Sequence, residues 1–465
     1  MPPLSTAATP PPALRQIGAW IAGLRRADIP EPVATVVSGC IADTLGVALA
    51  GARASAGRLV AADARDTYAD GPATLLAGGR LCPEGAAFAN VAAAHALDFD
   101  DNCYAGFVHG SAVVVPAALA AVEAAGGSGS DLLTAVTAGT EAQYVLADAV
   151  GNGVYHAGWW TTALFGAVGA AAAAAKAGGL TEAATADALA FALCGTGGLR
   201  ACFGTDAKPL LAAQAAAGGV RATRLAARGL EVPHGVIEDP RGFARLMAAG
   251  AFDGQVPATL GRYWRLLDPG IDTKAYPVCL SAHAALDAVR DLMAEERLSE
   301  ADIATVRCRV PPVVAANLTY DRPVTPAEAR FSLPFAVACA MRYGTLGLEH
   351  LDEAVLADPS LGAAMGRVAM AADPGWNDDP ERARRAPEGA EVTVVTLRGD
   401  SFTRFCAMPR GSAARPLAAA EHAAKFRACA VLAADRVPGP AEADRLYGRL
   451  RSLDRLPTLD GLLTP

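Results

Sequence analysis

Three stretches of the chain, residues 112–125, 161–177 and 184–194, are apolar on every side of a helix. This pattern restricts the fold more than any other feature, because a helix without a polar face must be surrounded by other helices. The uncharged run from Trp159 to Ala175 lies at the lower length limit of a membrane span. It consists mostly of Ala and Gly, however, and its flanks lack clusters of Lys and Arg. We therefore expect a buried core helix there.

The composition narrows the class of protein further. Hydrophobic residues make up 52% of the chain but aromatic residues only 6%, so burial must rest on Ala, Leu and Val. The net charge of −8 argues against a nucleic-acid partner, which usually needs a basic surface. The ten cysteines form no CxxC pair, which argues against a zinc ribbon or a disulfide framework. The first 16 residues lack a basic region followed by an apolar core, so we expect no secretory signal and a cytoplasmic protein without a membrane partner.

The spacing of apolar residues changes near residue 270. Before it, from about residue 12, apolar residues recur at three- and four-residue spacing, which is typical of helices. After it come an alternating strand, ATVRCRVPP, and a hairpin, EVTVVTLRGDSFTRFCAMP, with Gly-Asp at the turn. Helical pattern returns after Ser412. The prediction is a mainly α protein with a large all-helical domain (1–270 and 413–465) and an inserted smaller α+β lid domain (271–412).

Three basic side chains are predicted to stand at the amino ends of apolar helices. They are His109, His156 and Lys208. Helix amino ends already carry unpaired N–H groups and partial positive charge, so added basic residues favour carboxylate or phosphate ligands. The same environment tends to keep a histidine neutral and able to act as a base near pH 7. Removal of a proton beside a carboxylate needs such a base together with cations that hold the developing charge.

The acidic run AHALDFDDN, residues 94–102, precedes His109. If the run is helical, Asp98 and Asp101 share a face and Asp100 points elsewhere. A carboxylate on that face would orient the His109 ring or neutralise excess positive charge in the empty pocket. Two alternatives remain: a simple helix cap formed by the acids, and a divalent-metal site whose ligands would be His95, Asp98, Asp101 and His109. The metal alternative is the weakest, and we predict no metal.

The α+β segment adds further candidates. Cys279 and His283 stand four residues apart, on one helical face if the helix begins that early. Tyr320 can donate a proton or bind a carboxylate, and Arg322 lies beside it in the sequence. Ordinary packing is an alternative for each of them.

Taken in order, the motifs resemble the MmgE/PrpD family, which includes 2-methylcitrate dehydratase, cis-aconitate decarboxylase and iminodisuccinate epimerase. The resemblance covers nearly the whole chain. It rests on DTLGVALAG (43–51), AHALDFDDN (94–102), HGSAVVVPAALA (109–120), KPLLAAQAAAGGVRATRLA (208–226), KAYPVCLSAHAALDA (274–288), ARFSLPFAVACAM (329–341) and KFRACA (425–430).

This resemblance implies a helical domain built from both ends of the chain, an inserted α+β lid and a homodimer. It also implies an active site between the domains that uses no metal, iron–sulfur cluster or other cofactor. By resemblance, the positions at or near that site are Asp98, Asn102, His109, His156, Lys208, Cys279 and Tyr320. His283 remains an alternative to Cys279 as the side chain that takes part in the site.

Several positions depart from the family pattern. Asn102 stands where threonine is common, and HGS replaces HPS at 109–111. Leu211 and Cys279 stand where histidines are expected, the latter in the decarboxylase branch. These departures remove cationic and hydrogen-bonding groups. They disfavour a tricarboxylate and make cis-aconitate decarboxylation a less favoured reaction.

The sequence thus predicts a cofactor-independent lyase that abstracts a proton beside a carboxylate of a small di- or tricarboxylic acid and eliminates a β group. His156 or His109 would be the base, Lys208 the substrate anchor, Tyr320 the acid and Asp98 the group that orients a histidine. Substrate binding would involve Asn102, Lys208, Cys279, His283 and Arg322. The alternatives are an epimerase or isomerase of a small dicarboxylate, a decarboxylase of the cis-aconitate type, and a non-catalytic anion-binding homologue.

Overall fold

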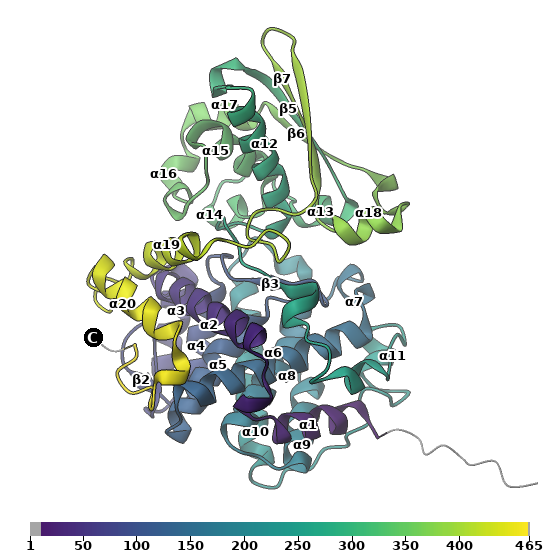
Figure 1. The fold of residues 1–465 in the computed structure, drawn as a ribbon, viewed down its shortest axis with the longest axis vertical. Coiled ribbons are helices and arrows are strands. Elements are labelled where there is room, and N and C mark those ends of the chain that lie inside the picture. Colours follow the sequence, from purple (N-terminus) through teal and green to yellow (C-terminus); the bar gives the residue numbers. More distant parts are fainter. Residues whose placement is uncertain (1–10, 464–465) are drawn as a thin grey trace, which may run out of the picture.

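The computed structural model describes residues 11–463, and helices dominate it (Figure 1). Residues 1–10, which belong to the segment where no secretory signal is expected, lie outside the described part. The first part of the chain contains α1 (Ala13–Gly23), α2 (Glu31–Gly51), α3 (Ser55–Thr67), α4 (Pro83–His95), α5 (Gly110–Ala125), α6 (Gly129–Val150), α7 (Gly153–His156), α8 (Thr161–Ala177), α9 (Glu182–Cys194), α10 (Ala207–Ala226) and α11 (Phe243–Met247). Its short strands are β1 (Ala73–Thr74), β2 (Arg80–Leu81), β3 (Asn102–Cys103) and β4 (Ile271–Asp272).

Small residues let the central helices pack closely. A Cβ added at Gly139 of α6 would lie 2.6 Å from the carbonyl oxygen of Gly169 in α8, closer than real Cβ atoms approach. Every residue of α8 from Thr161 to Ala175 is buried, which confirms the prediction of a core helix. By length and composition one described helix, α2, could cross a membrane, but 83% of its apolar stretch is buried inside the protein.

The expectation for residues 184–194 is wrong in part. Helix α9 lies at the edge of the helical unit, where it contacts α1, α8 and α10. Its outer face leaves Phe191 and Cys194 exposed. An apolar pattern therefore does not distinguish a helix at the edge of the bundle from one at its centre.

The second part of the chain forms an α+β unit with its own apolar core, above the helical unit in Figure 1. Its four-stranded sheet has the order β6–β5–β7–β8, in which β5 runs parallel to β6 and antiparallel to β7. The predicted strand and hairpin are confirmed as β5 and as β7 with β8. The elements are α12 (His283–Glu295), β5 (Ile303–Val310), α13 (Pro312–Asn317), α14 (Pro326–Ala329), α15 (Leu333–Tyr343), α16 (Glu353–Leu356), α17 (Pro359–Met365), β6 (Val368–Ala372), α18 (Pro380–Arg385), β7 (Ala390–Thr396) and β8 (Ser401–Cys406).

After β8 the chain returns to the helical unit. Helices α19 (Ala419–Ala430) and α20 (Pro440–Leu450) pack against α2 (Figure 1). The buried Lys425 of α19 forms an ion pair with Asp43 of α2 at 2.8 Å. The two ends of the chain thus share one helical unit. Whether the α+β unit moves as a lid stays a prediction.

Candidate active site

His109 and Lys208 face the same small cavity between the two units. His109 is the residue that precedes the first turn of α5, and Lys208 is the second residue of α10, so both lie at helix amino ends as predicted. The cavity has a volume of about 30 Å³. It is lined by Asn102, Phe107, His109, Tyr155, Trp160, Phe203, Lys208, Cys279, Leu280, Asn317, Phe331 and Glu388.

His156 does not join them. The prediction that it opens the apolar helix is wrong, because α8 begins at Thr161 and His156 is the last residue of the short helix α7. Its side chain is exposed, and its ring lies edge-on to Phe107 and Tyr155, which line the cavity, whereas His156 is not among the lining residues.

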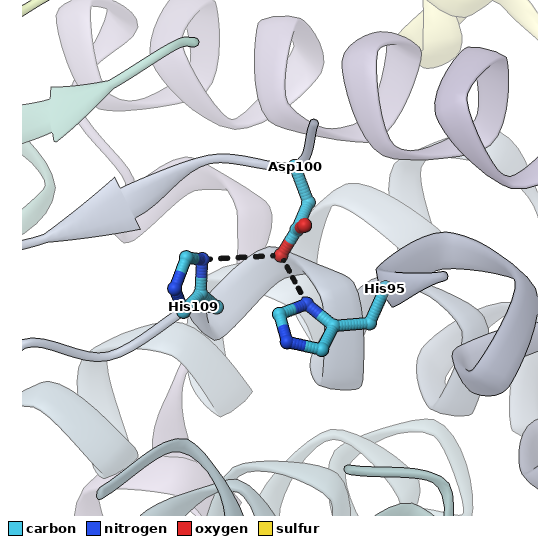
Figure 2. Close-up of side chains that lie close together, drawn as sticks. All are labelled: His95, Asp100 and His109. Atoms are coloured by element: carbon cyan, nitrogen blue, oxygen red, sulfur yellow. Dashed lines mark hydrogen bonds and ion pairs between the residues drawn. The ribbon is translucent and has the colours of Figure 1, made fainter. Parts of the chain in front are cut away.

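Asp100 binds two histidine rings at once (Figure 2). Its Oδ2 atom lies 2.8 Å from Nδ1 of His95 and 3.2 Å from Nδ1 of His109. The His95 ring also stacks on Trp160, with ring centroids 5.3 Å apart. A carboxylate in this position fixes the orientation and tautomer of both rings.

The contacts of His109 suit it to act as a base. Its Nδ1 lies 2.9 Å from the main-chain oxygen of Asp101 as well as near Asp100, so both acceptors favour a proton on Nδ1. Burial lowers the pKa of His109 to about 4, and the nearby Lys208 and Lys274 act in the same direction against Asp100. The ring is therefore neutral at pH 7, which leaves Nε2 free to accept a proton.

Asp98 does not orient a histidine, and this prediction is wrong. The helix α4 ends at His95, so the acidic run is not helical, and Asp98 adopts a left-handed backbone conformation (φ 50°). Its carboxylate forms a close ion pair with Lys208 and a second one with Lys274 at 3.0 Å. Lys274 also donates a 2.7 Å hydrogen bond to the main-chain oxygen of Asp98. Burial opposes ionisation of Asp98, but the two ammonium groups outweigh it and hold the pKa of this acid far below its usual range.

The third acid of the run, Asp101, is buried away from the cavity. Its Oδ1 accepts a 3.4 Å hydrogen bond from the main-chain N–H of Ser111, and burial raises its pKa to about 7. The four ligands of the alternative metal site, His95, Asp98, Asp101 and His109, therefore do not converge. Potential ligand atoms of His95, Asp100 and His109 do lie within 4.8 Å of one another. In the described arrangement these atoms satisfy each other through hydrogen bonds, which supports an orienting role for Asp100.

Replacing Asp101 with asparagine is expected to flatten the dependence of stability on pH. Because burial raises the folded-state pKa of Asp101 to about 7, the folded protein binds a proton there that the unfolded chain has lost above its usual pKa of about 4. The wild-type protein should therefore lose stability as the pH rises from about 4 to 7, by an amount on the order of 3 kcal/mol from this group. Asparagine resembles the uncharged acid and removes that loss.

Urea unfolding at pH 5 and pH 8 measures the effect. Asp444→Asn, at a half-exposed acid of α20 that pairs with Arg427, should keep the wild-type difference between the two pH values. Equal differences in the wild type and in Asp101→Asn would show that Asp101 is ionised in the folded protein.

The α+β unit supplies the opposite wall of the cavity. Cys279 lines it just before α12, and burial raises the pKa of its thiol to about 11. Glu388 is buried and accepts hydrogen bonds from the hydroxyls of Ser281 and Tyr104, the latter at 3.0 Å. Burial also raises the pKa of Glu388. The second wall therefore carries a protonated thiol and a carboxyl group of raised pKa, opposite a first wall that carries a neutral base.

Asn317 connects this wall to the helical unit. Its side-chain oxygen accepts hydrogen bonds from Tyr155 at 2.9 Å and from Arg200 at 2.6 Å, and its nitrogen donates to Ser281 at 3.0 Å. Arg200 also stacks over the Tyr155 ring at 4.0 Å. These contacts join the two units directly beside the cavity.

The other predicted binding residues have different positions. Asn102 lines the cavity from β3, and its amide nitrogen has no hydrogen-bond partner within residues 11–463. Tyr320 is half-buried and donates a 3.3 Å hydrogen bond to the main-chain oxygen of Phe203, outside the cavity lining. Arg322 is exposed to solvent.

Cys279 and His283 do not share a helical face, because α12 begins at His283. His283 is buried within the α+β unit, where its Nε2 lies 3.2 Å from the main-chain oxygen of Val278. Of the two, only Cys279 is among the described residues that line the cavity.

Sequence reasoning missed several charged or polar groups at this site. The helical pattern places Asp100 on another face, and it indicates no role for Lys274, Glu388 or Arg200. Lys274 did carry a signal, since it is a single charge at the start of the quoted motif KAYPVCLSAH. Glu388 had none, because nothing near it in the sequence marks a buried acid.

Larger hollows exist elsewhere on the protein. One of about 600 Å³ lies beside α11 and is walled mainly by apolar residues such as Phe243, Leu246 and Met247. No histidine lines it among the described residues. The chemistry is therefore concentrated in the small cavity between the units.

The chain belongs to the MmgE/PrpD family. The family model of the MmgE/PrpD N-terminal domain matches residues 15–255, and that of the C-terminal domain matches residues 276–445. These matches confirm the resemblance stated from the motifs.

Curated relatives agree with this assignment. The chain is 31% identical to the cis-aconitate decarboxylase of Homo sapiens over 75% of its own length and 73% of that protein. It is 29% identical to the cis-aconitate decarboxylase of Mus musculus, over 75% of this chain and 72% of the relative. The cis-aconitate decarboxylase of Aspergillus terreus is 27% identical over 69% of each chain.

Proposed function

We propose that this protein is a lyase that removes a proton beside a carboxylate of a small di- or tricarboxylic acid and then eliminates a β group. The observation that carries the proposal is the neutral His109 ring, held through Nδ1 by Asp100 and the Asp101 carbonyl, in the same cavity as Lys208. A neutral imidazole is the form that accepts a proton. An ammonium group beside it stabilises the negative charge that develops on the substrate.

Under this proposal each wall of the cavity has a role. His109 takes the proton through Nε2, and Lys208 binds the carboxylate beside the reacting carbon. Glu388 replaces Tyr320 as the acid that protonates the leaving group, because Glu388 lines the cavity and burial raises its pKa. Asp100 acts through His109 by fixing its ring.

The second candidate is decarboxylation of the cis-aconitate type. It is supported by the names of the three relatives and by the aromatic residues Trp160, Phe203 and Phe331 in the cavity lining, which suit a site where a carboxylate is lost. The absence of histidine at Cys279, where the decarboxylase branch is expected to carry one, counts against it. The proposal keeps three further expectations from the sequence: a homodimer, a cytoplasmic location and catalysis without a bound cofactor.

Incubation in deuterated water with a panel of di- and tricarboxylic acids, followed by NMR, separates these reactions. The panel includes malate, citrate and cis-aconitate. We expect deuterium exchange beside a carboxylate together with loss of water from a hydroxy acid. Loss of carbon dioxide from cis-aconitate would favour the second candidate, and exchange without net conversion would favour an epimerase. No exchange and no conversion of any acid would refute the proposal.

A further inference from the structure

Arg330 is a largely buried cation without an anionic partner. It lies between α14 and α15, and no ion pair or side-chain hydrogen bond joins it to any residue from 11 to 463. Its Nε atom is buried and unpaired. Burial lowers the pKa of the guanidinium from its usual value, although arginine stays charged near neutral pH. Burying a charge without a partner costs free energy, so an anionic ligand that binds Arg330 would be stabilised at this position.

This guanidinium lines a second cavity next to the first. The second cavity has a volume of about 20 Å³, and the residues common to both linings are Lys208 and Phe331. Lys208 therefore lines both the cavity that holds His109 and the cavity that holds Arg330. The main chain of Arg330 is also tied to the first cavity, since its carbonyl oxygen accepts a 2.9 Å hydrogen bond from the N–H of Cys279.

The acids near Arg330 do not neutralise it. Asp98 lines the same cavity, but its two oxygens are already paired with Lys208 and Lys274. Asp206 also lines it, yet its side chain is exposed to solvent and forms no ion pair with Arg330. The guanidinium thus remains available for a ligand, and its planar fork matches a carboxylate through two parallel hydrogen bonds.

We propose that Arg330 binds a second carboxylate of the substrate, while Lys208 and His109 hold and deprotonate the end that reacts. The site then selects di- and tricarboxylic acids over monocarboxylic acids of the same length. This inference deepens the proposed function and rests on it, because it assumes that the cavity beside His109 receives the substrate.

Binding of matched probes tests the assignment without any turnover. Calorimetric titration of the full-length protein with succinate and with butyrate compares four-carbon acids that carry two carboxylates and one. We expect succinate to bind about 10- to 100-fold more tightly than butyrate. Arg330→Met should remove this preference by weakening succinate binding alone, and Arg330→Lys should retain part of it. Arg307→Met, at an exposed arginine on β5 of the same unit, should leave both affinities unchanged.

Three results would overturn the proposal: equal affinities of the wild-type protein for the two acids, equal weakening of both in Arg330→Met, or no measurable binding of succinate. If Arg330→Met does not fold, the conservative Arg330→Lys variant takes its place. The folded Arg330→Lys protein must then prefer succinate over butyrate by a smaller factor than the wild-type protein does. A protein that selects succinate through Arg330 but shows no exchange in deuterated water would refute the proposed reaction and leave this assignment standing.

Discussion

Replacing His109 with glutamine is expected to lower the turnover number about 1,000-fold on the acid that the wild-type protein converts. Glutamine retains a side chain of similar length but cannot accept the substrate proton. His109 is the one histidine among the described residues that both lines the first cavity and contacts Asp100. Steady-state kinetics should show the loss in kcat, with KM changed little because Lys208 remains.

Two further histidine variants test whether the loss of turnover is specific to His109. His156→Gln decides between the two bases that the sequence left open, and the exposed position of His156 predicts a change of only a few-fold. His234→Gln is a control outside the site, where the ring pairs with Asp187 at 2.9 Å. If His156→Gln loses activity as strongly as His109→Gln, His109 does not act alone as the base.

The pH profile adds an independent readout. Because burial lowers the pKa of His109 to about 4, its ring is neutral above that value and protonated below it. Turnover should therefore stay constant on the acid side of neutrality and fall as the pH is lowered through about 4. A fall centred near 6.5, the ordinary pKa of histidine, would point to a solvent-exposed ring such as that of His156.

Replacing Asp98 with alanine is expected to destabilise the folded protein by about 3–5 kcal/mol. The change leaves Lys208 and Lys274 buried without their shared carboxylate, and removing one partner from a buried ionic cluster costs far more than the cluster contributes as a whole. The folded-state pKa of Asp98 lies below its unfolded value, so this stabilisation is present above about pH 4 and is lost as the pH falls further.

Chemical denaturation at pH 7 measures this difference in the free energy of unfolding. Asp444→Asn breaks a half-exposed ion pair with Arg427 and should cost no more than about 1 kcal/mol. If Asp98→Ala costs no more than Asp444→Asn, the two lysines are solvated or deprotonated in the folded protein, and the cluster is not the buried site described above.

Local pattern was sufficient for several elements of the fold. The all-round apolar run at 161–177 predicted the core helix α8, because a segment without a polar face can bury itself only among other helices. Alternation in ATVRCRVPP predicted β5, because a strand with one buried face repeats every two residues. The edge position of α9 could not be predicted, because neighbours far along the chain decide which face of a helix stays exposed.

At the site, the sequence by itself determined part of the chemistry that is available: two basic residues at helix amino ends and an acidic run before one of them. Only the tertiary structure decided which groups meet. The end of α4 at His95 turned Asp100 toward the histidines and left Asp98 to Lys208 and Lys274. Such pairings depend on contacts between residues far apart along the chain, and local sequence does not encode the direction in which a loop turns its side chains.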